Sequence, residues 1–216
     1  MKKILVSALL VIASSAVFTQ NFEGTIMFGI EYVDLPDELA AYESMMPKEM
    51  SYKFKDNMAK MIQPSTMGQT VMIHDGKADK TTILMDLMGS KYAMEANNSK
   101  EKKEGVKPTI TILDETKEIA GYKCQKAEIT MIADDGEEQK LTVYYTKDIM
   151  VQNFGQTDIE GLDGFPLEYE MEKEGMIMKL TAKEVKKEKV SKAEFDIPKD
   201  YQTVTEEEFK AMFGGK

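Results

Sequence analysis

Few residues in this sequence carry the side chains that enzymes use for catalysis. His74 is the only histidine and Cys124 the only cysteine among 216 residues. A Ser-His-acid triad would have to use His74, but the neighbouring Asp75 belongs to an Asp-Gly turn, and no serine lies in a Gly-x-Ser-x-Gly motif. We therefore predict that His74 is a solvated residue at a strand end and that the protein is not an enzyme.

Cys124 lies in the stretch IAGYKCQKAEI, residues 119–129. No histidine or predicted helix start lies beside it to lower the pKa of the thiol. In an extended strand, Ala127 and Ile129 share one face and Tyr122 and Cys124 the other. Either both faces are partly covered, or Gly121 carries a bulge that resets the register. Both alternatives predict a buried, unreactive cysteine, and a redox or intermolecular role remains the competing hypothesis.

The 38 carboxylates fall mostly in turns and on outward strand positions. No pair stands out as the acid and base of a hydrolase, so an unrecognised hydrolase is only a third hypothesis. Residues 134–138 lack the alternating spacing of a calcium loop and read as a hairpin turn. A single histidine excludes histidine-rich metal sites. We predict no metal and no cofactor.

Methionine is abundant, with 18 residues. It could replace leucine as core filler, or line an adaptable apolar surface, because the flexible thioether fits irregular ligands. The spacings at 58–61, 85–88 and 176–178 also resemble soft ligands for cuprous copper. Residues three apart on a strand point to opposite faces, which weakens chelation by the first two pairs, whereas Met176 and Met178 share a face. We predict core filler, with an adaptable ligand surface and a copper site as the competing hypotheses.

The first residues, MKKILVSALLVIASSAVFTQ, have the layout of a secretory signal peptide: two lysines, an apolar run and small residues. We predict a signal peptide over residues 1–19, with cleavage after Ala16 or Thr19. No later stretch approaches the ~18 apolar residues of a membrane span, so the mature chain should have no transmembrane segment. The expected location is periplasmic or extracellular.

Charge and composition exclude one class of partner. The formal net charge is −10 and every basic residue is lysine. An acidic chain without arginine repels phosphate backbones and lacks the fork that grips phosphate, so nucleic-acid binding is not expected. A lone cysteine also leaves an exported domain without an internal disulfide, so its core must hold it together.

Hydrophobic periodicity predicts one domain over residues 20–216, built mainly of strands. Residues 22–32 alternate apolar and polar side chains, and Leu35, Leu39, Tyr42 and Met46 predict an amphipathic helix over 35–46. Thr205 and Glu208 form a capping box for a short C-terminal helix. Further strands are predicted at 50–54, 58–63, 70–74, 78–87, 90–96, 109–113, 119–132, 139–149, 165–171 and 176–182.

The predicted fold class is therefore mainly β, a large curved antiparallel sheet or half-barrel covered by one or two helices. No alternation of strand and helix indicates a parallel nucleotide-binding sheet.

The markers IAGYKCQKAEI, YYTKDI and GLDGFPLEYE, with the signal peptide and the strand meander, resemble a family of exported bacterial domains of unassigned function. The resemblance covers most of residues 22–201. Such domains are similar to the LolA/LppX lipoprotein-carrier fold, in which a curved sheet wraps an apolar cavity plugged by helices. The resemblance implies an acyl or other apolar ligand. The carrier begins with a helix and uses an arginine to control its lid, whereas this mature chain begins with a strand and has no arginine.

We expect an exported, non-enzymatic binding protein that holds an apolar or lipid-like ligand between the sheet and the 35–46 helix. The helix would supply Leu39, Tyr42, Met45 and Met46. The sheet-side candidates are Phe28, Met72, Tyr122, Tyr144, Leu167 and Tyr169. The alternative is an envelope structural or interaction module with a filled core and no small ligand. The sequence identifies no protein partner.

Overall fold

The computed structural model describes residues 21–96, 107–132, 138–151, 159–173 and 175–213. The predicted signal peptide and the predicted turn at 134–136 lie outside the described residues. Among the residues that are described, no helix is long and apolar enough to cross a membrane.

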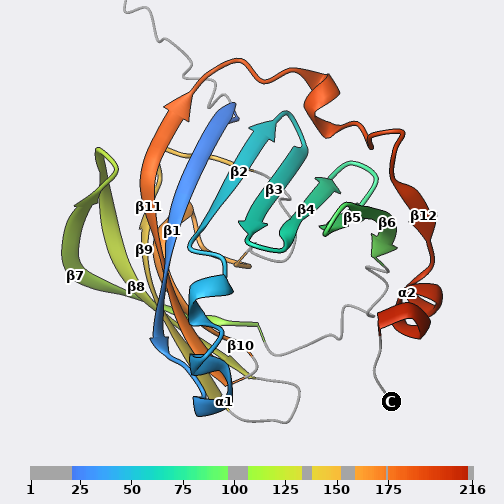
Figure 1. Ribbon diagram of the computed structural model, residues 1–216. Helices are drawn as coiled ribbons and strands as arrows, with labels where there is room; N and C mark the ends of the chain where they lie inside the picture. The colour runs from blue at the N-terminus through green and yellow to red at the C-terminus, as the bar shows by residue number, and fades with distance from the viewer. Residues whose placement is uncertain (1–20, 97–106, 133–137, 152–158, 174, 214–216) are drawn as a thin grey trace, which may run out of the picture.

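The described chain is a succession of strands with four short helical pieces (Figure 1). The strands are β1 (Gly24–Asp34), β2 (Glu49–Lys55), β3 (Met58–Ser65), β4 (Gly68–Asp75), β5 (Lys80–Leu87), β6 (Ser90–Ala96), β7 (Thr109–Ile119), β8 (Tyr122–Ile132), β9 (Glu138–Thr146), β10 (Phe165–Lys173), β11 (Met176–Lys187) and β12 (Gln202–Val204). The helical pieces are α1 (Asp37–Ala40), η1 (Glu43–Met45), η2 (Lys192–Phe195) and α2 (Glu206–Phe213), where η marks a 3-10 helix.

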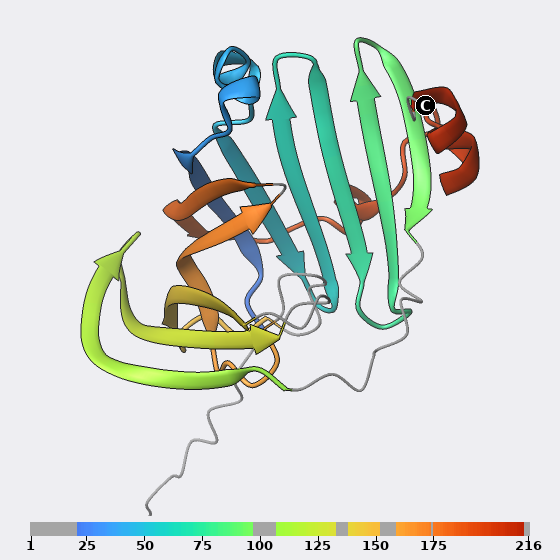
Figure 2. The ribbon, with the colours of Figure 1, turned by 90° about the horizontal axis from the view of Figure 1, so that it is seen from below.

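All twelve strands belong to one sheet, in the order β12-β6-β5-β4-β3-β2-β1-β11-β10-β9-β8-β7. Neighbouring strands are antiparallel except β12, which pairs with β6 in parallel. Figure 2 shows the sheet bending between β2–β6 and the curled β7–β8 hairpin. The predicted fold class, mainly β with a large curved antiparallel sheet, is confirmed.

The helix predicted over residues 35–46 is wrong as a continuous element. The segment contains only four residues of α1 and three of η1, and neither piece has a buried residue. A short helix is stable in water only when packing supports it, and this one buries no apolar stripe. The C-terminal helix α2 does begin with the predicted capping box: Glu208 N–H donates to Thr205 Oγ1 at 3.1 Å, and Thr205 N–H donates to Glu208 Oε2 at 2.7 Å.

Aromatic packing shows which face of the sheet is concave. The rings of Phe54 in β2 and Phe165 in β10 have centroids 5.5 Å apart, although β1 and β11 lie between these strands. Phe28 in β1 contacts Tyr52 and Tyr169 from the same face, at 6.0 and 6.1 Å. We call this face, which carries Phe28 and Tyr52, the inner face. Its core fills the space between β1–β2 and β8–β11.

A second, smaller core lies on the opposite, outer face of β3–β6. Val71, Ile73, Leu84 and Ala93 pack there against Val190 and Phe195 of the segment that leads to β12. The C-terminal segment therefore covers the outer face of these strands and leaves their inner face to other contacts.

One of the two alternatives for Cys124 placed Gly121 in a bulge within a single strand, and this alternative is wrong. Ala120 and Gly121 form the turn between β7 and β8, with φ of 48° and 82°. A Cβ at Gly121 would meet nothing within 4 Å, so the turn requires glycine for its left-handed backbone and not for space. The other alternative is confirmed, because Cys124 and Ala127 point to opposite faces and both are 0% exposed.

A buried carboxylate ties β7 to β10 on the outer face. Glu168 is 6% exposed, and both of its oxygens accept hydrogen bonds from Lys117 Nζ, at 2.6 and 2.7 Å. Thr181 Oγ1 donates to Glu168 Oε2 at 3.2 Å, and Lys179 Nζ lies 3.5 Å from Oε1. Because β8 and β9 lie between β7 and β10, this cluster holds the curled hairpin against the rest of the sheet.

The environment of Glu168 favours its charged form. Burial by itself raises the pKa of this carboxyl group, but the hydrogen bond and charge of Lys117, with Lys179 and Thr181, more than offset burial. The pKa of Glu168 is therefore below its ordinary value of 4.5.

Cys124 lies beside this cluster, opposite Lys117 in the ladder between β7 and β8. Burial, and then the charge of Glu168, raise the pKa of the thiol from its usual 9.0 to about 11. The thiol is therefore protonated at neutral pH and is a poor nucleophile.

Removal of the Lys117 ammonium should destabilise the protein, because it leaves Glu168 buried without its main partner. We expect Lys117→Met to lower the free energy of unfolding by about 1–3 kcal/mol. Lys147→Met is the matched control, since it breaks an exposed pair with Asp163 (2.8 Å) and should cost less than about 0.5 kcal/mol. Urea denaturation measures both, and equal effects would show that the Glu168 cluster contributes little.

The same cluster predicts a pH dependence. A carboxyl group with a lowered folded pKa stabilises the native state above its unfolded pKa, and this contribution is lost as the pH falls through the folded pKa. The difference in unfolding free energy between the wild type and Lys117→Met should be full at pH 7 and should shrink below about pH 4.5. A difference that is constant from pH 7 to pH 3 would contradict this assignment.

Thiol labelling tests the burial of Cys124. A shift of the pKa from 9.0 to about 11 lowers the thiolate fraction at pH 8 by about a hundredfold. We expect a disulfide reagent such as Ellman's reagent to react at least that much more slowly with the native protein than with the protein in urea. Equal rates in the two states would indicate an accessible, reactive cysteine.

Candidate functional site

Across β3–β6, the inner face carries a row of half-exposed apolar side chains. Cross-strand pairing places Met61 opposite Met72, Met72 opposite Ile83, and Ile83 opposite Met94. Tyr52 of β2 precedes Met61 in the same row and is buried. We call Met61, Met72, Ile83 and Met94 the inner row.

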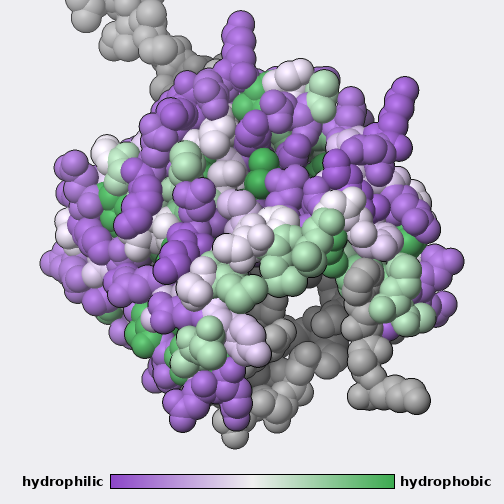
Figure 3. Space-filling view, in the orientation of Figure 1, coloured by the Kyte–Doolittle hydropathy of each residue, from purple (hydrophilic) through white to green (hydrophobic). Residues whose placement is uncertain are grey.

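The inner row is only partly packed. Met61 contacts the core between β1–β2 and β8–β11, whereas Met72, Ile83 and Met94 pack against neither of the two cores formed by the described residues. In the space-filling view, pale green, weakly hydrophobic residues lie where Figure 1 draws the β3–β4 turn (Figure 3). The inner row is therefore apolar surface that a ligand could cover.

No lysine, aspartate or glutamate points to the inner face of β3–β6, strands that the structure describes completely. The rows beside the inner row contain Gln63, Thr70, Met85 and Tyr92 on one side, and Ala59, His74, Thr81 and Ala96 on the other. The charged residues of these strands, Lys60, Asp75, Lys80, Asp86, Lys91 and Glu95, alternate to the outer face. In a chain with 31% charged residues, this separation leaves one face suited to apolar contact.

His74 is not solvated, contrary to the prediction. It is 8% exposed, and its Nδ1 lies 2.9 Å from Thr81 Oγ1 on the neighbouring strand. The hairpin pairs Asp75 with Lys80, and this pairing brings His74 and Thr81 directly opposite each other on the inner face. His74 therefore forms a polar boundary at one end of the apolar surface.

The structure separates the sheet-side residues predicted for the site. Phe28, Leu167 and Tyr169 are buried in the core on the inner face, where burial, and then Tyr52, raise the pKa of Tyr169 well above its usual value. Only Met72 of the predicted set lies in the inner row.

Tyr122 and Tyr144 lie on the outer face. Tyr144 pairs with Lys126 and donates a hydrogen bond to Glu115, and Lys117 Nζ lies 4.9 Å from the centre of its ring. Tyr122 has Lys187 Nζ at 5.9 Å from its ring centre. Both tyrosines are half-buried against the main core and have lysines beside their rings, and neither belongs to the inner row.

The residues predicted for the helix lie at one end of the sheet, in the connection between β1 and β2 (Figure 1). Leu39 and Met46 are half-buried, and Tyr42 and Met45 are exposed. Met45 O accepts a hydrogen bond from Thr66 Oγ1 of the β3–β4 turn at 3.2 Å. The four residues therefore border the sheet and do not cover the inner row.

Sequence reasoning missed Met61, Ile83 and Met94. Alternation along each strand could have shown that each shares a face with its second neighbours. It could not show that they stand in one row, because the row depends on the register of three hairpins.

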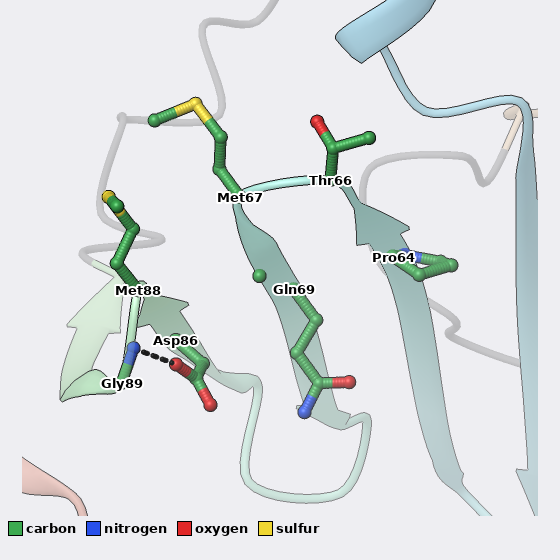
Figure 4. Close-up of a pocket in the computed structure, with 8 residues that line it drawn as sticks. Pro64, Thr66, Met67, Gln69, Asp86, Met88 and Gly89 are labelled. Atoms are coloured by element: carbon green, nitrogen blue, oxygen red, sulfur yellow. Dashed lines mark hydrogen bonds between the residues drawn. The ribbon is translucent and has the colours of Figure 1, made fainter.

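A hollow of about 550 Å³ lies between the β3–β4 and β5–β6 turns (Figure 4). It is lined by Pro64, Thr66, Met67, Gly68, Gln69, Asp86, Met88 and Gly89. Asp86 Oδ1 accepts a hydrogen bond from Gly89 N–H at 3.0 Å, which fixes the carboxylate against the turn.

Within the described residues, no group of three or more His, Cys, Asp or Glu side chains could hold a metal ion. Met58 packs against the core on the outer face and Met61 against the core on the inner face, so this pair cannot chelate one ion.

Comparison with known proteins identifies the family. No curated protein sequence matches the chain. Similar solved structures include the lipoprotein LppX of Mycobacterium tuberculosis and LprF of Mycobacterium bovis. LppX is 12% identical, with a TM-score of 0.40, and the match covers 78% of this chain and 89% of LppX. LprF is 10% identical, with a TM-score of 0.38, and the match covers 83% of this chain and 90% of LprF. Similarity at this level transfers no ligand and no role to the chain.

The family model that matches is described as N-glycanase peptide, N-terminal domain, and it matches residues 51–208, which include the inner row and the hollow between the turns. Because the match extends over more than half of the sequence, the chain belongs to the N-glycanase peptide N-terminal domain family.

Proposed function

We propose that the protein is an exported, non-enzymatic binding protein that holds an apolar or lipid-like ligand on the inner face of β3–β6. The observation that carries this proposal is the uncharged inner face with its half-exposed row of Met61, Met72, Ile83 and Met94. Export is proposed from the signal-like residues 1–19, with the periplasm or the exterior as the location.

Methionine suits an acyl chain or another irregular apolar ligand, because its thioether adapts at little cost. Covering about 200 Å² of apolar surface would contribute about 5 kcal/mol before the entropic costs of binding. The polar groups beside the row, among them Gln63, Thr70 and His74, could orient one polar end of the ligand.

We propose binding rather than glycan cleavage because the described residues hold no activated nucleophile beside a base. The Cys124 thiol is buried with a raised pKa, His74 is hydrogen-bonded to Thr81, and Glu168 is occupied by two lysines. The description of the family names an N-terminal domain of N-glycanase peptide, not a catalytic activity of that domain. A binding role for this β domain is compatible with that description.

The proposal predicts that a charge placed in the inner row weakens ligand binding. We expect Met72→Glu to weaken the uptake of a fluorescent fatty acid, supplied as monomer, by at least about tenfold, because an unpaired carboxylate in an apolar contact costs more than about 1.4 kcal/mol. Met88→Glu is the matched control: it makes the same change at a side chain that is 84% exposed in a turn.

Fluorescence titration measures both variants, with circular dichroism to verify that each is folded. Uptake by the wild type and Met88→Glu but not by Met72→Glu supports the proposal. No uptake by the wild type would reject an acyl ligand and favour the structural or interaction module. If Met88→Glu lost uptake of the fatty acid and Met72→Glu kept it, the ligand would bind in the hollow between the turns instead of on the inner row.

A further inference from the structure

Four exposed apolar side chains gather at one end of the sheet. Tyr42 and Met45 come from the β1–β2 connection, Met67 from the β3–β4 turn and Met88 from the β5–β6 turn, and their exposed fractions are 57, 42, 49 and 84%. Two hydrogen bonds join these segments: Thr66 Oγ1 donates to Met45 O at 3.2 Å, and Met88 N–H donates to Met67 O at 3.0 Å. We call Tyr42, Met45, Met67 and Met88 the apolar rim.

Figure 2 draws the three segments of the rim at the same end of the sheet. In Figure 4 the side chains of Met67 and Met88, which both line the hollow, extend from neighbouring turns and away from the strands. The rim is thus a set of projecting tips and not a flat patch.

Met88 occupies a position where the backbone disfavours it. Met88 and Gly89 form the two-residue turn between β5 and β6, with φ of 53° and 89°. Such turns favour Asn, Asp or Gly, and the chain itself places Asp56 and Asp79 at two of its other left-handed positions. An apolar side chain that is exposed and also strained violates two local preferences, which is typical of a functional position.

The rim adjoins the inner row. Met85 lies three residues before Met88 on β5 and shares the inner face with Ile83. Along a strand this separation is about 10 Å, less than the length of a common acyl chain. An acyl chain that entered at the rim would meet Met85 first and then Met72 and Ile83.

The charges around the rim determine which kind of lipid surface the rim can contact. Asp86 lines the hollow between the turns, and Lys91, opposite Asp86 on β6, is paired with Asp200 at 2.7 Å. The β1–β2 connection carries three acidic residues, Asp37, Glu38 and Glu43, against one lysine, Lys48. The chain as a whole has a net charge of −10 and no arginine. An anionic lipid surface would be repelled, whereas a zwitterionic one presents ammonium groups that Asp86 can attract.

We propose that the apolar rim docks on the surface of a zwitterionic lipid bilayer, where the ligand passes between the bilayer and the inner row. This inference rests on the proposed function, because an acyl ligand is held in membranes and scarcely dissolves in water. Separate apolar tips can enter the headgroup region one by one, whereas a stable protein interface needs a continuous, complementary surface.

Vesicle flotation with phosphatidylcholine tests this inference. Met88→Asn introduces the residue that the turn prefers, so the variant should fold at least as well as the wild type. We expect it to bind these vesicles about tenfold more weakly, since it removes the most exposed apolar side chain of the rim. Ile112→Thr is the control, because it removes an exposed apolar side chain on β7, away from the rim, and should bind like the wild type.

Three results would overturn the inference: no flotation of the wild type, equal flotation of Met88→Asn and the wild type, or stronger binding to phosphatidylglycerol vesicles. A concentration-dependent dimer that Met88→Asn abolishes would show instead that the rim joins two copies of the chain. The uptake of monomeric fatty acid is measured without vesicles, so a failure of flotation with intact uptake rejects the docking surface and leaves the proposed function standing.

Discussion

On the inner face, Phe28 of β1 packs against rings from strands on either side of β1. These rings are Tyr52 of β2, and Phe165 and Tyr169 of β10. These contacts require the sheet to bend strongly, and burial of the rings offsets the cost of the bend. The bend fills one half of the inner face with core. It ends at β3, and beyond it Met72, Ile83 and Met94 pack against neither of the two cores formed by the described residues.

The outer face depends on different chemistry. Glu168, held by Lys117 and Lys179, ties the curled β7–β8 hairpin to β10, and the apolar residues of the 190–195 segment cover β3–β6. With the outer face of β3–β6 covered and its charges directed outward, the half-buried inner row is the apolar surface of these strands on which we propose that a ligand binds. The proposed ligand surface is thus a consequence of how the two faces are filled.

Much of the fold could be predicted from the sequence, and less of the site. The alternation in β1, the Asp75-Gly76 hairpin and the Thr205–Glu208 capping box are local signals, and the structure has them where expected. The 35–46 helix failed because its apolar spacing finds no surface to pack against. His74 failed because its burial depends on Thr81, which a hairpin brings beside it.

The strand-rich class, the acidic charge, the lack of arginine and the excess of methionine follow from the amino-acid sequence, because composition and period-two alternation are local properties. The face that Met72 shares with its second neighbours on the strand follows from the same alternation. The fold was needed to show that Met72 stands in a row with Met61, Ile83 and Met94, and that Phe28 and Tyr169 are core instead of ligand surface. The reason is physical: strand register and sheet curvature arise from contacts between residues distant in the sequence, and alternation within one strand does not encode them.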